Sequence, residues 1–316
     1  MFTRALFATL FATPSIALAC ASCSCALSSD WESQGYTAGP GWRLDLRYDY
    51  VNQSELRGGS HRINRADYPV GPAQTDKVEQ VTTNRNFTVG LDYSPNRDWG
   101  FNLQLPYVDR FHQTVTPGNS TISESDTGKL GDARIVARYL GFSEARNFGV
   151  SVGLKLPTGE HKQNFSAGPD AGSPLDRGLQ AGSGTTDLLL GAFRFGALSR
   201  EWDWFAQAQF QWATQARDDY RPGSLFAVGS GVRYVGYASV TPEIQINVQH
   251  RRRDSGNNAD ADNSGGTLVY LSPGATLNLG ATTKLYGYLQ LPLSQHVEGK
   301  QLAPRLTATA GVRFAF

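Results

Sequence analysis

The stretch Trp202-Asp-Trp-Phe-Ala-Gln-Ala-Gln-Phe-Gln-Trp212 shows the pattern that decides the fold. Apolar residues occupy every second position, and Asp203, Gln207 and Gln209 fall between them. Because side chains of a β-strand point alternately to two faces, the stretch predicts a strand with one apolar and one polar face. It is longer than the usual strand of about five or six residues and matches a tilted strand that crosses a membrane.

Similar alternating stretches fill the rest of the chain from Gly41 onward. We count twelve of them, at 41–52, 80–93, 100–112, 130–141, 149–156, 184–196, 201–213, 224–236, 240–252, 266–280, 282–293 and 305–316. An even number of antiparallel strands is typical of bacterial membrane barrels. We therefore expect an all-β fold, a transmembrane antiparallel up-and-down β-barrel of about twelve strands over residues 41–316.

The connections between these stretches alternate in length. Long connections at 53–79, 113–129, 157–183, 214–223 and 253–265 alternate with short ones at 94–99, 142–148, 197–200, 237–239 and 281. Bacterial barrels have long extracellular loops and short periplasmic turns. The alternation therefore predicts that both termini lie in the periplasm of a Gram-negative cell.

Aromatic residues at strand ends also favour the membrane interpretation. The last strand ends on Phe316, which resembles the terminal signal that the barrel-assembly machinery reads in outer-membrane proteins. Other aromatics occur where interfacial girdles belong, at Trp42, Tyr48, Tyr50, Tyr93, Trp99, Tyr107, Trp202 and Trp212. We expect outer-membrane lipid and the assembly machinery as partners.

The amino terminus predicts export. Residues 1–19 carry Arg4, an apolar run and the ending Ala17-Leu18-Ala19, which is the pattern of a cleaved signal peptide. The run is too short to cross a bilayer as a helix. Residues 20–40 show no clean alternation and are interpreted as a tail in the periplasm or a small plug in the barrel.

All three cysteines, Cys20, Cys23 and Cys25, lie in that tail. Three thiolates so close together could bind a soft metal such as Cu(I) or Zn(II). A disulfide, lipidation of Cys20, or removal with the signal peptide would explain the cluster equally simply. We expect no other cofactor.

Four short motifs recur in one protein family. Leu154-Lys-Leu-Pro-Thr-Gly-Glu160, Gly182-Ser-Gly-Thr-Thr-Asp-Leu188, Leu105-Pro-Tyr107 and Gly131-Asp-Ala-Arg134 resemble the MetA-pathway-of-phenol-degradation family of outer-membrane barrels. The resemblance extends over residues 41–316. It implies a barrel and transport, and it leaves the substrate open.

The polar faces predict which side chains enter the lumen. They include Arg43, Asp45, Arg47, Asp49, Asn102, Gln104, Asp132, Arg134, Arg138, Lys155, Asp187, Arg194, Asp203, Gln207, Gln209, Arg233, Glu243, Gln245, Gln249, Lys284, Arg305 and Arg313. Because an isolated charge is costly in such an interior, these groups must be hydrated or paired. Either water fills the lumen and the charges set its selectivity, or opposite charges pair and close it.

Twelve strands enclose more space than the eight of a barrel filled by side chains and less than the sixteen or more of an open porin. Arginine pairs on one face, Arg43 with Arg47 and Arg134 with Arg138, favour an anion or a carboxylate. We expect a channel or transporter for small solutes, anionic or aromatic ones among them. The alternative is a non-conducting structural or assembly barrel whose cysteine tail binds a soft metal or a periplasmic partner.

Two function classes are disfavoured. The 29 Lys and Arg residues nearly balance the 28 Asp and Glu residues, which gives no reason to expect a nucleic-acid partner. The five histidines are scattered, and no serine, histidine and acid grouping stands out as catalytic machinery. We therefore expect no enzymatic activity.

Overall fold

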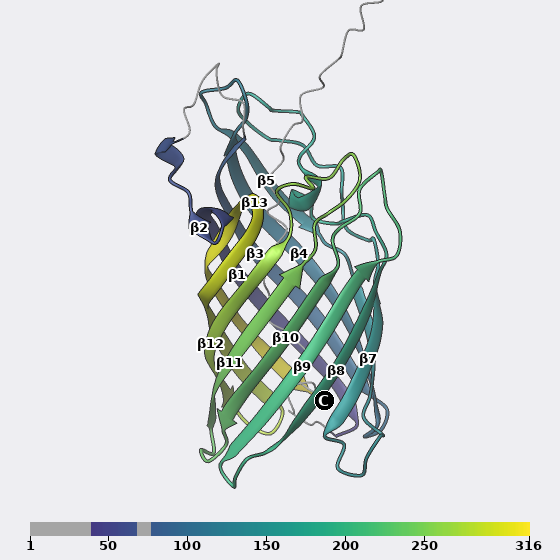
Figure 1. The fold of residues 1–316 in the computed structure, drawn as a ribbon. Coiled ribbons are helices and arrows are strands. Elements are labelled where there is room, and N and C mark those ends of the chain that lie inside the picture. The colour runs from purple at the N-terminus through teal and green to yellow at the C-terminus, as the bar shows by residue number, and fades with distance from the viewer. Residues whose placement is uncertain (1–38, 68–76) are drawn as a thin grey trace, which may run out of the picture.

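The computed structural model describes residues 39–67 and 77–316, which form a closed antiparallel β-barrel (Figure 1). Around the wall the strands follow the order β13-β12-β11-β10-β9-β8-β7-β6-β4-β3-β1, and β1 pairs with β13 to close the ring. The wall strands are β1 (Gly41–Gly59), β3 (Val78–Ser94), β4 (Trp99–Val115), β6 (Arg134–Tyr139), β7 (Phe148–Lys155), β8 (Asp187–Ala197), β9 (Trp202–Ala213), β10 (Leu225–Tyr234), β11 (Val240–Arg251), β12 (Gly266–Asn278) and β13 (Thr283–Ala315).

Four short elements lie off this ring. β2 (His61–Arg62) pairs with β1, and β5 (Ser123–Leu130) pairs with β4. Two single turns of 3-10 helix, η1 (Arg65–Asp67) and η2 (Arg177–Leu179), belong to the connections. No helix in the described part of the chain is long and apolar enough to cross a membrane.

The ring closes because β13 crosses the wall twice. In a closed ring, all neighbours can be antiparallel only if the number of passes is even. The described ring has eleven strands, so one of them must reverse direction. β13 pairs with β12 along 284–297 and with β1 along 297–315, and Gly299, with a φ of 65°, lies where its partner changes. The described wall therefore has twelve passes, and the expected antiparallel barrel is confirmed.

The outer face of the barrel is apolar. Residues that alternate with the lumen side chains keep roughly 40 to 50% of their surface exposed, among them Leu103, Leu105, Val152, Leu190, Ile244, Ile246 and Leu289. A continuous apolar outer face is the surface that membrane barrels present to lipid. Near the turns at 95–98 and 140–147, stacked and tilted aromatic pairs form a girdle. The ring centroids are 4.3 Å apart for Trp42–Tyr93 and 4.8 Å apart for Trp99–Tyr139.

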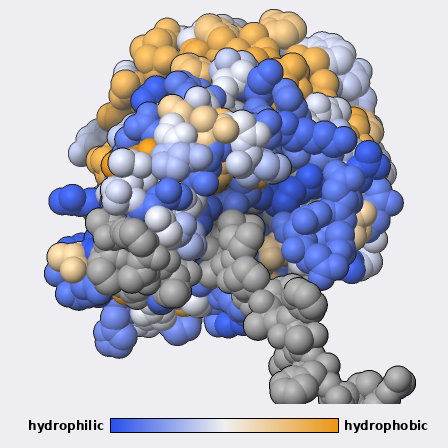
Figure 2. Space-filling view, turned by 90° about the horizontal axis from the view of Figure 1, so that it is seen from above, coloured by the Kyte–Doolittle hydropathy of each residue, from blue (hydrophilic) through white to orange (hydrophobic). Residues whose placement is uncertain are grey.

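The two ends of the barrel differ in the length of their connections. Short turns at 95–98, 140–147, 198–201, 235–239 and 279–282 lie at one end, together with the carboxyl terminus (Figure 1). Longer loops gather at the other end, where the surface is largely hydrophilic (Figure 2). We refer to these as the short-turn end and the long-loop end.

Several strands run farther than the sequence pattern predicts. β1 extends to Gly59 and β4 to Val115, and residues 294–304 belong to β13 although no strand is expected there. The pass expected at 130–141 is interrupted. β5 and β6 both pair with β4, and residues 131–133 between them leave the strand.

Candidate functional site: the lumen

The inward side chains near the short-turn end are buried and paired around Asp92 on β3. The Asp92 carboxylate lies 2.9 Å from Arg43 Nη1 and 2.8 Å from Arg138 Nη2, and Arg313 Nη2 lies 3.8 Å away. Asp92 and Arg138 are 2% and 1% exposed. Buried ion pairs of this kind tie β1, β3, β6 and β13 together along the inner wall.

Apolar side chains complete the closure at this level. Phe193 and Phe195 on β8, Phe205 on β9 and Leu140 form one buried cluster. The prediction that Arg194 faces the lumen is wrong, because Arg194 is exposed and pairs with Ala206 on the outer face. Both faces of β8 are apolar here, so alternation alone does not fix the direction.

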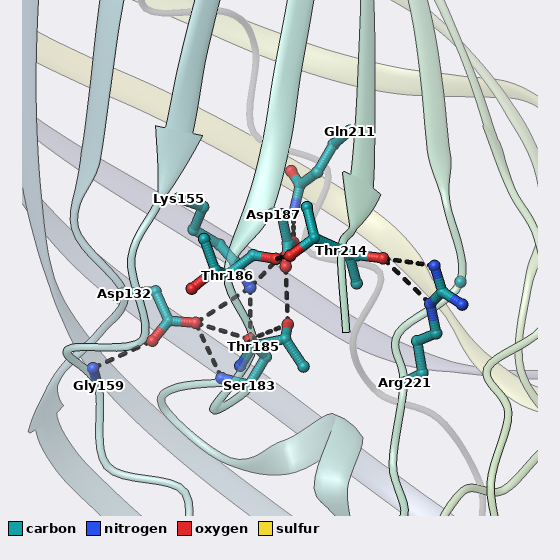
Figure 3. Close-up of polar contacts among 12 residues, drawn as sticks. Asp132, Lys155, Gly159, Ser183, Thr185, Thr186, Asp187, Gln211, Thr214 and Arg221 are labelled. Carbon is teal, nitrogen blue, oxygen red and sulfur yellow. Dashed lines mark hydrogen bonds and ion pairs between the residues drawn. The ribbon is translucent and has the colours of Figure 1, made fainter. Parts of the chain in front are cut away.

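The family-like motifs meet at one polar cluster, which anchors the loop 156–186 (Figure 3). Lys155 Nζ lies 3.2 Å from Asp132 and 3.0 Å from Asp187, and it also donates to Ser183. The Asp132 carboxylate accepts hydrogen bonds from the backbone of Gly159 at 3.0 Å and of Ser183 at 2.9 Å. The motif residues therefore hold both ends of this loop to the inner wall.

Glycine is required where three backbone segments cross in this cluster. A Cβ atom on Gly159 would lie 2.8 Å from backbone atoms of Gly131 and Gly182, and one on Gly182 would lie 2.5 Å from Gly159. Such contacts are too close for any side chain. The glycines of the two loop motifs thus serve close packing of backbones.

A cavity of about 380 Å³ lies inside the barrel, away from the Asp92 cluster. Its lining in the described chain includes six residues with cationic side chains and three with carboxylates. The cations are Arg47, Arg110, Arg134, Lys155, Arg177 and Arg251, and the acids are Asp49, Asp132 and Asp187. Each acid already accepts a hydrogen bond, as Asp49 does from Arg47 at 2.8 Å and Asp187 from Thr185 at 2.7 Å. The lining therefore carries a net positive charge of about three.

Arg134 differs from the other cations of the cavity. It is exposed inside the barrel, and its side chain makes no hydrogen bond or ion pair within residues 39–67 and 77–316. Asp132 and Asp187 attract it at longer range, and Arg47 and Arg251 repel it. Its guanidinium group is thus available to a solute.

The predicted lumen residues divide into two levels. Arg47, Asp49, Gln104, Asp132, Arg134, Lys155, Gln207 and Gln209 line the cavity. Nearer the short-turn end Arg43, Asp45, Arg138, Arg233, Glu243 and Arg313 are buried, and half-exposed Asp203 lies 3.2 Å from Arg233. The structure therefore combines a level with a cavity and, nearer the short-turn end, a lower level that is closed by buried side chains.

Sequence reasoning missed Asp92 and Arg110, although alternation with Leu91 and Phe111 would have placed both inside. Arg110 donates to Asn84 at 2.5 Å and reaches the carbonyl oxygens of Gly178 and Gln180 in the loop 156–186. It thereby fixes the part of this loop that lines the cavity. No sequence signal indicates that the loop folds inward.

A second buried ionic cluster lies at the long-loop end. Lys77 forms an ion pair with Asp176 and lies 3.6 Å from Glu79, whose carboxylate is 3.1 Å from His112 Nε2. Asp260, in the loop 252–265, lies within electrostatic range of Lys77 and Asp176. Its pKa is raised to about 7, chiefly by burial and further by the negative charge of Asp176.

This cluster predicts that the loop 252–265 is held less firmly at neutral pH than at acidic pH. Because the pKa of Asp260 in the folded protein lies above its ordinary value of 3.8, its contribution is complete below pH about 4 and is lost as the pH rises through about 7. Protease cleavage within this loop should accelerate as the pH rises from about 4 to about 7, the window between the two pKa values, and should level off above it. Asp260→Asn should abolish the acceleration, and an unchanged pH profile in that variant would contradict the assignment.

The cysteine cluster and the signal peptide lie outside the described residues. The metal site expected at Cys20, Cys23 and Cys25 therefore stays a prediction. The expected plug or tail at 20–40 falls almost entirely in the same region.

Comparisons with known proteins support the fold. No protein-family model matches the chain, and no curated protein matches it. Among solved structures, the COG4313 outer membrane channel from Pseudomonas putida F1 aligns with a TM-score of 0.66 and 14% identity, over 92% of this chain and 100% of that one. The β domain of the Bordetella autotransporter BrkA aligns with a TM-score of 0.53 and 15% identity, over 88% and 100%.

A weaker likeness, with a TM-score of 0.48 and 9% identity, links the chain to the Pseudomonas putida toluene transporter TodX, over 88% of this chain and 90% of that one. At these identities the similarity concerns the fold alone. The chain is thus a closed antiparallel barrel of the kind found in outer-membrane proteins. Inside it lie a positively charged cavity and, nearer the short-turn end, the buried ion pairs around Asp92.

Proposed function

We propose that this protein is an outer-membrane channel or transporter for small anionic solutes. The observation that carries the proposal is the lining of the cavity, where six cationic side chains face three carboxylates that are already engaged. A pore lined by excess positive charge concentrates anions and repels cations. Phe210 and Tyr220 are the aromatic residues of the cavity lining, and the nine charged side chains outnumber them, so the cavity favours charge over aromatic character.

The apolar outer face and the girdle support an outer-membrane location. The long-loop end would face the cell exterior, and both termini would lie in the periplasm. An outer-membrane channel, the COG4313 channel, is among the proteins of similar fold.

The buried Asp92 cluster favours a second candidate, a non-conducting barrel. As described, the cavity does not continue past the buried arginines of the lower level. In this alternative the cysteine tail would bind a soft metal or a periplasmic partner, and the barrel would serve as its anchor. In a channel, the same cluster would be the gate that must rearrange for a solute to pass.

Chloride efflux from liposomes separates the two candidates. Purified protein, with folding verified by heat-modifiable migration on gels, is reconstituted in vesicles that contain a chloride-sensitive dye. The channel should release chloride well above protein-free vesicles, and it should pass potassium, an ion of similar size and opposite charge, more slowly. Folded protein that leaves the vesicles as tight as the lipid alone would favour the non-conducting barrel.

A further inference from the structure

Carboxamide side chains on β9 and β11 line the cavity in two columns. Cross-strand pairing aligns Gln209 on β9 with Ala227 on β10 and Ala227 with Gln249 on β11. One step along, Gln207 pairs with Gly229, and Gly229 pairs with Asn247. Since directly paired residues share a face, two columns of amides flank a column of small residues.

The amides of Gln207 and Asn247 lean over the small residue between them. Ala227 and Gly229 both line the cavity, and a Cβ atom on Gly229 would lie 2.8 Å from Asn247 Oδ1 and 3.3 Å from Gln207 Nε2, so these two amides cover Gly229. Gly191 and Ser151 continue the row of small residues on β8 and β7. A solute in the cavity can therefore approach the amides from the side.

Charge and amides converge on the same space. Arg134 lines the cavity together with the amides, and its cross-strand neighbour Gln104 adds another carboxamide beside it. A guanidinium group binds a carboxylate in two parallel hydrogen bonds. Carboxamides both donate and accept, which suits hydroxyl groups because these do the same.

We propose that the cavity is a binding site for a small polyhydroxylated carboxylate. Arg134 holds the carboxylate, and the amides of β9 and β11 hold the hydroxyl groups. A volume of about 380 Å³ lies at the lower end of small-molecule sites and limits the ligand to a compact one. The inference rests on the proposed function and names the class of anion that the channel takes.

Three six-carbon probes separate the two parts of the proposal. Gluconate has both a carboxylate and hydroxyl groups, hexanoate has only the carboxylate, and sorbitol has only hydroxyl groups. Calorimetric titration of the folded protein in detergent should show gluconate binding about tenfold or more tightly than either of the others, because each lacks one set of hydrogen bonds. Hexanoate equal to gluconate, or sorbitol equal to gluconate, would overturn the proposal.

Two variants and a control locate the site. Arg134→Gln should weaken gluconate binding about tenfold or more, and Ala227→Leu should do the same by filling the space between the amide columns. Arg194→Gln removes an arginine from the outer face and should leave binding unchanged. Gluconate affinity that is the same in all three folded variants would overturn the site.

The same preparations distinguish this inference from the proposed function. If vesicles release chloride but gluconate does not bind, the channel stands and the hydroxy-carboxylate site is refuted. If gluconate binds as expected but no chloride passes, the site is supported and the channel is refuted.

Discussion

Replacing Asp92 by asparagine is expected to destabilise the barrel by about 3–5 kcal/mol, because removing one partner leaves buried charges uncompensated. Arg43 and Arg138 contact this carboxylate at 2.9 and 2.8 Å, and all three side chains are buried. The same change should loosen the lower level and increase single-channel conductance. Urea unfolding in detergent, followed by heat-modifiable migration, measures the first effect.

A matched control uses the exposed ion pair between Asp98 and Arg146, whose side chains are 38% and 37% exposed. Asp98→Asn should change stability by less than about 1 kcal/mol, because water screens such pairs. If both variants unfolded at the same urea concentration and conducted alike, the buried cluster would be neither a structural tie nor a gate.

Reversing two charges in the cavity is expected to invert ion preference. Arg134→Glu with Arg251→Glu turns the excess of three positive charges in the lining into an excess of one negative charge. Since a pore concentrates ions of the sign opposite to its lining, the double variant should prefer cations. The measurement is the permeability ratio of potassium to chloride in a planar bilayer under a salt gradient.

The control for this variant is Arg194→Glu, which makes the same chemical change on the outer face of β8. It should leave the permeability ratio as in the parent protein. An unchanged ratio in the double variant, with folding verified, would show that current does not pass the cavity.

The strand pattern alone predicts most of the wall. Alternation in 202–212 places Asp203, Gln207 and Gln209 inside, and the length of the connections separates the two ends of the barrel. Period two fails to give the direction at Phe193, Arg194 and Phe195, because here the two phenylalanines point inward and the arginine points outward.

The contents of the lumen are harder to predict from sequence. Alternation places Arg134 and Arg138 on the same face, yet Arg138 is buried against Asp92 while Arg134 remains exposed in the cavity. That difference depends on residues from other strands and on the inward loop 156–186. Its anchoring residues are visible as motifs, but their joint contact with Asp132 is a tertiary feature.

The reversal potential of the unmodified protein tests the central claim most directly. Single openings are recorded in a planar bilayer that separates two different concentrations of potassium chloride. We predict a reversal potential with the same sign as the equilibrium potential of chloride, which means that anions cross more readily than cations. A reversal potential of the sign set by potassium, or no openings from protein verified as folded, would contradict the claim.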